Sequence, residues 1–476
     1  MKYFEKNEAY KDRTAVIDTT GNQLTYNDLY TYSTEIASKV PKRSLVFLFC
    51  HNVAGSFAGY FGFLSNDIVP VLLDMHIEEE LARNLLSIYK PSYIYIPTEQ
   101  KEQYGTFECV QEQYDYCLLK TNYGVEHSLY PELALLLTTS GSTGSPKFVR
   151  QSYKNIQANA ESIAQYLELD ETERPITTLP MNYTYGLSII NSHLLVGATI
   201  LMTDFSLMEK GFWEFFKKEE ATSFGGVPYT YEILKKLRFF RMDLPSLRTM
   251  TQAGGKLSPE LHKEFAQYAK EQGKQFVVMY GQTEATARMA YLPAERSLEK
   301  YGSMGIAIPG GKFTLVDVEE QAITEPDVTG ELIYEGPNVT LGYAECLEDL
   351  QKGDERHGKL ITGDMAKMDE DGFFYIVGRK KRFLKIYGNR VNLDEVERML
   401  KSNFEAYDFA CGGLDDQLYA FVTTEDEDAK TKVKKFLAEK TGLNHKAFTV
   451  QSIDQIPKNE AGKTLYIKLE GYYGVQ

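Results

Sequence analysis

The segment from Leu135 to Lys147, LLLTTSGSTGSPK, constrains this chain more than any other. A run of apolar residues typical of a buried strand opens directly into a loop rich in Gly, Ser and Thr, and the loop ends at a lysine. Glycines let the backbone turn without a clash at Cβ, and the amides and hydroxyls of such a loop can surround a phosphate, beside the mobile charge of the lysine. The segment therefore predicts a phosphate-binding loop formed by Thr139, Ser140, Gly141, Ser142, Thr143, Gly144 and Lys147.

The spacing excludes the common P-loop, in which Gly and four further residues precede Gly-Lys and then Ser or Thr. The Gly-Lys positions hold Pro146 and Lys147, and Phe148 stands where the magnesium-binding hydroxyl would be. The Gly-Lys-Thr at 462–464 has Pro457 in place of the leading glycine. The loop must therefore bind phosphate in another way.

This loop resembles the nucleotide loop of the AMP-forming adenylating enzymes, the superfamily of acyl-CoA synthetases, peptide-synthetase adenylation domains and firefly luciferase. A single Gly/Ser/Thr cluster is more often a simple turn. The resemblance therefore depends on further motifs, and four of them follow along the chain.

The second motif is QFVVMYGQTEATARM, which predicts a strand over its first five residues and then a turn. The resemblance implies that Tyr280, before Gly281, stacks on adenine, that Thr283 bonds the α-phosphate and that Glu284 holds magnesium. An aromatic ring suits a purine, and a carboxylate is the hard oxygen ligand that magnesium prefers. The alternative is an ordinary strand-end turn with a solvated glutamate.

The third motif, TQAGGKLSP at 251–259, resembles the family loop that runs along the adenine and the acyl pocket. Ala253, Gly254 and Gly255 would allow close approach to a ligand. Ser258 followed by proline also predicts the start of a helix, with serine as the N-cap. Both interpretations can hold together.

The fourth motif spans residues 360–397 and is the most family-specific block of the chain. The resemblance implies that Asp364 accepts both ribose hydroxyls, a task for two acceptor oxygens, and that Arg379 makes a second ribose contact. It places Lys381 at the hinge of the C-terminal domain and Gly388 on the face that this domain presents to a thiol. Without the resemblance, the basic run in this block would be interpreted as a solvated surface.

The fifth motif, IPKNEAGKTLY, resembles the C-terminal catalytic motif, in which Lys463 is the key residue. Adenylation joins a carboxylate oxygen to the α-phosphorus, so two anions must meet, and a lysine on a loop lowers that barrier. Alone, a lysine near a chain end is usually a surface residue. Two positions depart from the family pattern: Phe148 replaces the usual glycine and Asn459 replaces the common threonine.

Five blocks in the family's order make coincidence implausible, and the resemblance covers the whole chain. Alternating strand and helix patterns predict an α/β fold, with a large N-terminal α/β domain of mostly parallel sheets (1–378) and a small mobile C-terminal α+β lid domain (379–476). Apolar runs predict buried strands at 44–50, 68–74, 92–96, 133–139, 198–204 and 276–281, and helical spacing predicts a helix over 156–167. The lid is expected to hold helices near 392–403 and 428–441 and a strand near 418–424.

Composition excludes several other classes. A chain of 476 residues with 43% hydrophobic residues can form two or three cores, and its net charge of −15 argues against a nucleic-acid partner. The five cysteines form no CxxC pair and no metal-binding spacing, as expected of reduced thiols. The charged N-terminus lacks an apolar signal region, and no segment approaches the roughly 18 apolar residues of a membrane span. We therefore expect a cytoplasmic protein with no membrane partner.

The resemblance implies an AMP-forming carboxylic acid:thiol ligase that uses ATP and Mg²⁺. The acid would form an acyl-adenylate with release of pyrophosphate, the lid would rotate about Lys381, and a thiol would displace AMP. We expect coenzyme A as the thiol. The alternative is the phosphopantetheine arm of an acyl carrier protein acting in trans, because no carrier domain follows Lys463 in the sequence.

The small carboxylic acid substrate is only partly constrained. Thr184 stands where amino-acid-activating relatives have an aspartate for the substrate ammonium, so an α-amino acid is not expected. Arg288 either clamps a second anionic group of the substrate or forms a surface ion pair, which is the commoner outcome. An acyl pocket with aromatic walls is predicted from Tyr183, Val227 and Tyr229, with Tyr185 nearby.

Two further classes share the nucleotide motifs. A luciferase-like oxidase would need oxygen chemistry, for which the sequence contains no support. An inactive nucleotide-binding scaffold is the non-enzymatic alternative. The residues that argue against a scaffold are Thr283, Glu284, Asp364, Arg379 and Lys463.

Overall fold

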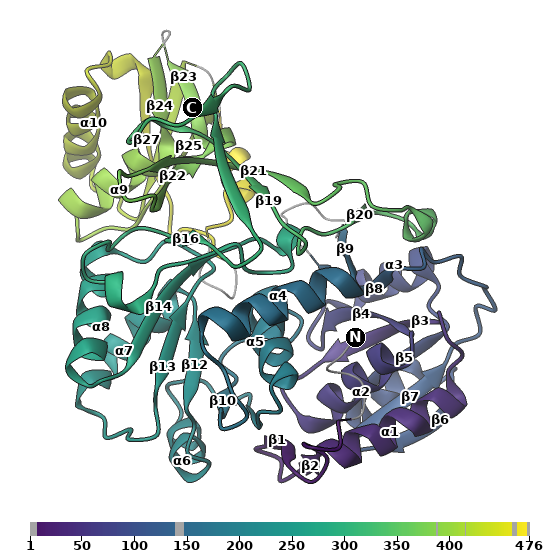
Figure 1. The fold of residues 1–476 in the computed structure, drawn as a ribbon. Helices are drawn as coiled ribbons and strands as arrows, with labels where there is room; N and C mark the ends of the chain where they lie inside the picture. Colours follow the sequence, from purple (N-terminus) through teal and green to yellow (C-terminus); the bar gives the residue numbers. More distant parts are fainter. Residues whose placement is uncertain (1–6, 139–146, 387–388, 415, 459–463, 474–476) are drawn as a thin grey trace. The chain divides into compact units, whose positions relative to one another are not determined.

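The computed structural model describes residues 7–138, 147–386, 389–414, 416–458 and 464–473, and the chain divides into two compact units (Figure 1). Unit 1 comprises Met1–Phe313 and Tyr334–Leu360. Unit 2 comprises Thr314–Ile333 and Ile361–Gln476. The domain boundary predicted at residue 378 stays a prediction.

The first large sheet of unit 1 has a parallel centre, β8-β4-β3-β5, flanked by antiparallel strands. Its central strands are apolar and buried on both faces, which is typical of parallel sheets. In spatial order the eight strands are β20 (Gly342–Ala344), β9 (Phe148–Ser152), β8 (Leu133–Thr138), β4 (Val69–Asp74), β3 (Leu45–Cys50), β5 (Tyr93–Pro97), β7 (Tyr116–Lys120) and β6 (Glu108–Gln113).

The second large sheet of unit 1 is parallel from β14 to β1 and antiparallel at its ends. In spatial order its nine strands are β16 (Ile306–Ala307), β15 (Ala290–Tyr291), β14 (Gln275–Tyr280), β13 (Thr249–Gln252), β12 (Ser223–Gly226), β10 (Pro175–Ile176), β11 (Ile200–Met202), β1 (Thr14–Asp18) and β2 (Gln23–Thr25).

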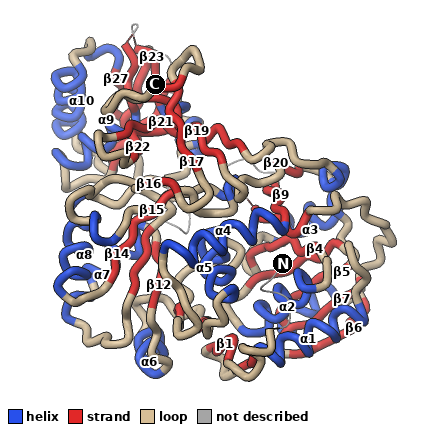
Figure 2. The backbone as a smooth tube through the Cα atoms, in the orientation of Figure 1, coloured by secondary structure: helices blue, strands red, loops and turns tan. Residues whose placement is uncertain are grey.

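Helices α4 (Tyr153–Tyr166) and α5 (Thr184–Leu195) lie between the two large sheets (Figures 1 and 2). Ile156 and Leu187 join the core of the eight-stranded sheet, whereas Ile163 and Ile189 join the core of the nine-stranded sheet. The two helices therefore present apolar side chains to both sheets, and they fix the position of one sheet against the other.

The remaining helices of unit 1 cover the other sheet faces. An aromatic cluster joins α7 and α8 to the nine-stranded sheet, where the Tyr231 ring lies 4.8 Å from Phe265 and 5.3 Å from Phe276. The bounds of these helices are α1 (Tyr26–Lys39), α2 (Ala54–Ser65), α3 (Glu79–Tyr89), α6 (Lys210–Lys218), α7 (Pro228–Lys236) and α8 (Pro259–Glu271); short 3₁₀ turns are η2 (Thr98–Tyr104), η3 (Phe239–Arg241), η4 (Thr283–Ala285), η5 (Ala294–Arg296) and η6 (Leu347–Gln351).

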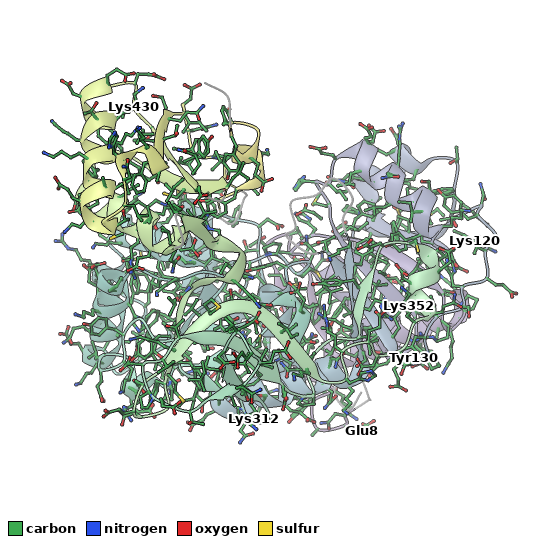
Figure 3. The ribbon with its side chains drawn as sticks, turned by 90° about the horizontal axis from the view of Figure 1, so that it is seen from above. Glu8, Lys120, Tyr130, Lys312, Lys352 and Lys430 are labelled. Carbon is green, nitrogen blue, oxygen red and sulfur yellow. The ribbon has the colours of Figure 1, made fainter. Side chains whose placement is uncertain are left out.

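Residues 334–360 return to unit 1 from far along the chain. The segment that ends near Lys352 lies beside Tyr130 (Figure 3), whose amide donates to the Leu350 carbonyl at 2.8 Å. Asn155, which caps α4 with Ser152, also donates its side-chain amide to the carbonyls of Pro337 at 2.8 Å and Val339 at 2.7 Å. These bonds hold the returning segment against the eight-stranded sheet.

Unit 2 contains three sheets. A five-stranded sheet has the order β18 (Ala322–Ile323), β17 (Lys312–Val316), β19 (Gly330–Glu335), β21 (Lys359–Met368) and β22 (Phe374–Arg379). After η7 (Lys380–Arg382) come the hairpin of β23 (Phe383–Ile386) and β24 (Asn389–Asn392), and then α9 (Leu393–Asn403), β25 (Phe409–Leu414), β26 (Gln417–Val422), α10 (Glu427–Thr441), η8 (His445–Ala447), β27 (Phe448–Ser452) and α11 (Ile467–Glu470). Helix α10 crosses over between the parallel strands β26 and β27.

The predicted α/β fold class is confirmed. Each predicted buried strand is present within a few residues of its predicted bounds, and so are the predicted helices of the C-terminal part. Ser258 caps α8 with Pro259 at its first position, as predicted. All five cysteines are free. Among the described residues, none of the helices combines the length and the apolar character that crossing a membrane requires.

Helix α2 is packed too tightly for a side chain at Gly59, so we predict that Gly59→Ala destabilises the protein. An added methyl group would overlap the buried Tyr95 ring, whose hydroxyl is held by Tyr32 at 2.8 Å. The overpacking should cost more than the helix propensity of alanine restores, for a net loss of about 1–2 kcal/mol. Urea unfolding followed by circular dichroism measures this loss.

The control is Gly62→Ala in the same helix. There the added methyl group lies 3.3 Å from the flexible Ile36 side chain, so the change in stability should stay within about 0.5 kcal/mol. Equal stability of the two variants would show that α2 can shift away from β5.

Candidate nucleotide and acyl site

Glu284 follows the carboxyl end of β14, as the sequence predicts, and lies in the turn η4. Tyr280, the last residue of the strand, is half-buried, and so are Gly281, Thr283 and Glu284. A side chain at Gly281 would overlap the Ala287 carbonyl, so glycine is required where the turn folds back on itself. An aromatic ring, a hydroxyl and a carboxylate thus follow one another within five residues at the carboxyl end of β14.

Tyr343 holds the Glu284 carboxylate. Its hydroxyl donates to Glu284 Oε1 at 2.7 Å, and the Glu284 carbonyl accepts from the Thr340 amide at 3.0 Å. Burial and the neighbouring carboxylate raise the pKa of Tyr343 to about 12. The hydroxyl therefore stays protonated near neutral pH and remains a donor to the carboxylate.

Two cationic side chains flank the same tyrosine. Lys147 Nζ lies 3.8 Å from the centre of the Tyr343 ring, and the Arg356 guanidinium carbon lies 4.6 Å from it. Arg356 also donates to Thr340 Oγ1 and, at 3.3 Å, to the Glu284 carbonyl. The lysine that ends the predicted phosphate loop and the predicted magnesium ligand thus meet at one aromatic ring. Two positive charges beside a carboxylate suit a polyphosphate with its metal ion.

The donor set at Glu284 fits magnesium. One carboxylate oxygen is fixed by Tyr343, so the group is oriented before a cation binds. Among the described residues no group of three or more His, Cys, Asp and Glu side chains could enclose a metal. Magnesium usually takes one or two carboxylates and completes its shell with phosphate oxygens and water, so a single oriented glutamate is adequate.

The loop after β13 approaches the predicted acyl pocket. Gly254 has φ +82°, and a side chain there would lie 2.7 Å from the Tyr183 hydroxyl and 3.0 Å from Val227. Ala253 is buried, and Gly255 packs against Pro228. The structure thus brings the predicted glycine loop together with two of the three predicted pocket residues.

The other aromatic residues differ in exposure. Tyr185 is buried, with its hydroxyl 2.8 Å from Thr251 Oγ1 and its ring 6.4 Å from that of Tyr183. Tyr229 is 49% exposed at the start of α7, and its place in the pocket stays a prediction. Phe148 is fully buried, with its ring 5.0 Å from Tyr89. This departure from the family pattern thus contributes to the core of the eight-stranded sheet.

Of the two alternatives for Arg288, the surface ion pair is wrong, because Arg288 is only 2% exposed. Its Nε donates to Ser188 Oγ at 3.0 Å and its Nη1 donates to the Tyr166 hydroxyl at 3.1 Å. Burial lowers the pKa of the neighbouring His193 to about 4, so that ring is neutral near neutral pH.

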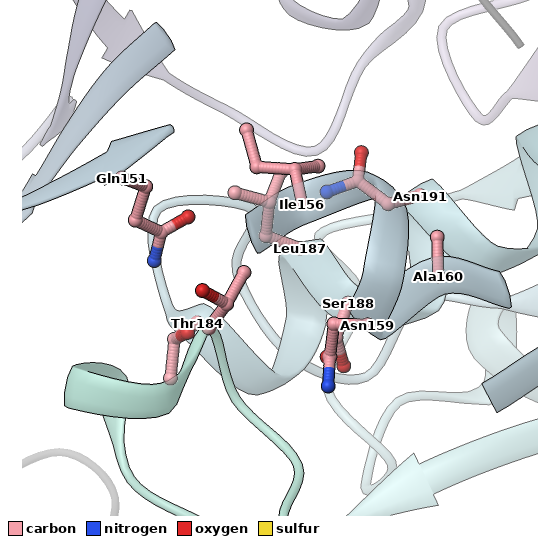
Figure 4. A pocket seen from close by; sticks show the side chains of 9 residues that line it. Gln151, Ile156, Asn159, Ala160, Thr184, Leu187, Ser188 and Asn191 are labelled. Atoms are coloured by element: carbon pink, nitrogen blue, oxygen red, sulfur yellow. The ribbon is translucent and has the colours of Figure 1, made fainter. Parts of the chain in front are cut away.

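A small polar cavity lies beside Ser188 (Figure 4). It measures about 10 Å³, which is space for one water molecule. Gln151 Nε2 and Asn159 Oδ1 are buried and have no hydrogen-bond partner within the described part of the chain. The lining side chains come from β9, α4, α5 and the turn after η4: Gln151, Ile156, Asn159, Ala160, Thr184, Leu187, Ser188, Asn191 and Thr286.

The predicted ribose contacts lie together in unit 2. Asp364 and Arg379 face each other across the antiparallel pair of β21 and β22, and Arg379 Nε lies 2.7 Å from Asp364 Oδ1. The Asp364 amide donates to Thr362 Oγ1 at 3.0 Å. Asp364 is 2% exposed whereas the Arg379 side chain is half exposed. The carboxylate of the pair is therefore buried, and the guanidinium reaches solvent.

Several predicted residues lie outside the described part of the chain. Lys381 lies in η7, where only its backbone is described. The predicted residues that lie outside the described ranges are Thr139, Ser140, Gly141, Ser142, Thr143, Gly144, Gly388 and Lys463.

Tyr343 and Arg356 are site residues that sequence reasoning missed. Each comes from a stretch with no glycine loop, no charge run and no family motif that we identified. Their positions depend on the pairing of β20 with β9, which sets Tyr343 opposite Val149, two residues after Lys147. Such long-range contacts, and not a local pattern in the chain, connect them to the nucleotide motifs.

Comparison with known proteins agrees with this site. A family model described as AMP-binding enzyme matches residues 3–344. A peroxisomal OPC-8:0-CoA ligase of Arabidopsis thaliana is 30% identical over 350 residues, which are 70% of this chain and 63% of that relative. A 2-succinylbenzoate–CoA ligase of Geobacillus kaustophilus is 30% identical over 352 residues, 71% of this chain and 69% of the relative. The match thus spans less than two thirds of the Arabidopsis protein.

A solved structure shows the same fold. The o-succinylbenzoate CoA synthetase of Bacillus subtilis, in complex with its acyl-adenylate intermediate, has a TM-score of 0.77 with this chain at 22% identity. The alignment covers 96% of this chain and 95% of that structure. The same synthetase has also been solved with ATP and a magnesium ion.

If Tyr343 orients Glu284, then Tyr343→Phe should weaken the magnesium-dependent part of ATP binding about 10-fold, because a group that hydrogen-bonds to a metal ligand contributes at this level. The ring remains, so the contacts of Lys147 and Arg356 should persist. Calorimetric titration of ATP with and without Mg²⁺ measures the effect. The control is Tyr123→Phe at an exposed tyrosine of unit 1. An unchanged magnesium dependence in the Tyr343 variant would remove the tyrosine from the site.

Proposed function

Because the chain belongs to the AMP-binding enzyme family, we propose that it is an AMP-forming ligase that joins a small carboxylic acid to the thiol of coenzyme A. The observation that carries this proposal is the cluster in which the Tyr343 hydroxyl holds the Glu284 carboxylate while the Tyr343 ring contacts both Lys147 and Arg356. A fixed carboxylate with two cations beside it matches the needs of a magnesium-bound triphosphate.

In the first half-reaction an oxygen of the acid attacks the α-phosphorus of ATP. The bond from that phosphorus to the bridging oxygen breaks, and pyrophosphate leaves with its electron pair. Lys147 and Arg356 would neutralise the charge that develops on the leaving group, and Lys463 would bridge the two anions. Magnesium held by Glu284 would add further neutralisation of the phosphates.

We propose that Asp364 accepts the ribose hydroxyls and that Arg379 steadies its carboxylate. The 2.7 Å ion pair holds the Asp364 carboxylate where β21 meets β22, and the half-exposed arginine beside it agrees with access from solvent. A carboxylate can accept from both hydroxyls of a ribose.

In the second half-reaction the thiol attacks the acyl carbon and AMP leaves. We propose that Lys381 is the pivot of this change, that the boundary lies near residue 378, and that Gly388 lies on the face that receives the thiol. Coenzyme A is favoured over a carrier protein because the similar relatives are named as CoA ligases. We propose that the enzyme acts in the reducing cytoplasm, and its five free cysteines agree with such a compartment.

The direct test is ATP–pyrophosphate exchange across a panel of fatty, aryl, hydroxy and amino acids, followed by AMP release with coenzyme A for each active acid. Exchange with CoA-dependent turnover supports the proposal. Exchange without CoA turnover points to a carrier protein in trans. No exchange with any acid overturns the proposal and supports an inactive scaffold.

We predict that Lys463→Ala abolishes acid-dependent pyrophosphate exchange and leaves ATP affinity nearly unchanged, because the lysine acts where charge develops between the two reactants. The matched control is Lys468→Ala, at an exposed lysine five residues along the chain. Undiminished exchange in the Lys463 variant would exclude this role.

For Asp364→Asn we predict a loss of ATP affinity of roughly 10–100-fold, the size expected for hydrogen bonds to a charged group. The variant and the wild type should bind 2′,3′-dideoxy-ATP equally weakly, because that nucleotide lacks the hydroxyls in question. An equal loss for both nucleotides would show that Asp364 does not contact the ribose.

A further inference from the structure

Arg288 is a buried arginine whose partners in the described part of the chain are all neutral. Its guanidinium donates to Ser188 Oγ at 3.0 Å, to the Tyr166 hydroxyl at 3.1 Å and to Met279 Sδ at 3.2 Å, all of which are neutral. Within the described ranges it forms no ion pair, and its Nη2 donates to no residue. Nη2 is not among the buried atoms that lack a partner, so it keeps some access to solvent and could reach an anion. An anion there would offset the cost of burying the rest of the charged group.

Arg150, a fully buried arginine of unit 1, shows how the fold neutralises such a group when it is structural. Its side chain is 0% exposed and pairs with the Glu355 carboxylate at 2.5 Å. It also donates to main-chain carbonyls, including that of Tyr343 at 2.9 Å. Arg288 is nearly as buried, at 2% exposed, but no such carboxylate pairs with it among the described residues. A ligand is therefore the candidate for its anionic partner.

Arg288 lies beside the predicted acyl pocket. Its guanidinium carbon is 5.1 Å from the centre of the Tyr185 ring, and that ring packs against Tyr183 at 6.4 Å. Tyr183 in turn faces the loop glycine Gly254. Arg288 also follows Glu284 by four residues in the same turn region, so one short segment connects the metal-binding end of the site with the aromatic wall.

We propose that Arg288 binds a second carboxylate on the acid substrate, and that the enzyme therefore selects dicarboxylic acids over monocarboxylic acids of similar shape. This inference rests on the proposed acid-activating function. One carboxylate would react at the α-phosphorus while the other accepts from the arginine. A planar guanidinium matches a carboxylate with two parallel hydrogen bonds, and burial strengthens the attraction. No proton transfer or redox step is required of Arg288.

A purely structural role is the rival explanation, because Tyr185 and the three neutral acceptors could suffice to hold the side chain. The two explanations differ in their effect on substrate choice. A structural arginine affects all acids alike, whereas an anion-binding arginine affects only acids that carry the second charge.

The test begins with the wild-type enzyme. Short aliphatic and aromatic diacids are each compared with their monomethyl esters in ATP–pyrophosphate exchange. We expect kcat/KM to favour the best diacid over its ester by about 100-fold, the scale of a buried charge pair. Efficient exchange with monoacids and no preference for diacids would overturn the inference and leave the proposed function intact. No exchange with any acid would instead overturn the proposed function.

Variants then assign the preference to Arg288. Arg288→Gln should reduce the diacid preference about 10-fold or more through the loss of diacid activity, and Arg288→Lys should retain part of it because the charge remains. The control Arg296→Gln removes an arginine that pairs with Glu299 in the same region, and it should keep the wild-type ratio. Thermal melting shows which variants are folded. A folded Arg288→Gln variant with the full diacid preference would overturn the assignment. If that variant does not fold, the same comparison is made with Arg288→Lys, and an unchanged diacid preference there would overturn the assignment.

Discussion

The arrangement of the candidate site depends on the buried guanidinium of Arg150. From the middle of β9 it donates to the carbonyls of Tyr343 at 2.9 Å and Leu341 at 3.3 Å, and it pairs with Glu355. These partners belong to a segment about two hundred residues further along the chain, and Glu355 offsets the desolvation of the buried charge. The guanidinium thereby fixes β20 against β9, and this pairing delivers Tyr343 to the end of the phosphate loop.

From this constraint the geometry of the site follows. β9 begins directly after Lys147, and β20 places Tyr343 above that lysine and within 2.7 Å of Glu284. Lys147 and Glu284 follow strands of different sheets, so neither sheet alone could bring them together. The helices α4 and α5, which pack on both sheets, make the two loop positions part of one rigid unit. Preorganisation of this kind reduces the entropy that a ligand would otherwise have to offset.

The features that the sequence predicts correctly are those set by residues close together in the chain. Continuous apolar runs such as β3 and β8 identify buried parallel strands, and Ser258 with Pro259 identifies the start of α8. The motifs predicted that Glu284 follows a strand end and that the loop of Gly254 runs along the acyl pocket, and the structure places Gly254 against Tyr183 and Val227. Arg288 shows the limit of such reasoning. Its sequence context left a surface ion pair and an anion clamp both open, and only its burial excluded the surface pair.

The sequence by itself determined the α/β class and the positions of most strands and helices, because those features arise from side-chain periodicity and turn chemistry within one stretch of chain. The tertiary structure alone decided that Tyr343 and Arg356 join Lys147 and Glu284, that Phe148 is a core residue, and that Arg288 is buried with no carboxylate beside it in the described ranges. The physical reason is that these properties depend on pairing between segments far apart in sequence, and on which charges the fold removes from water, neither of which leaves a local pattern in the chain.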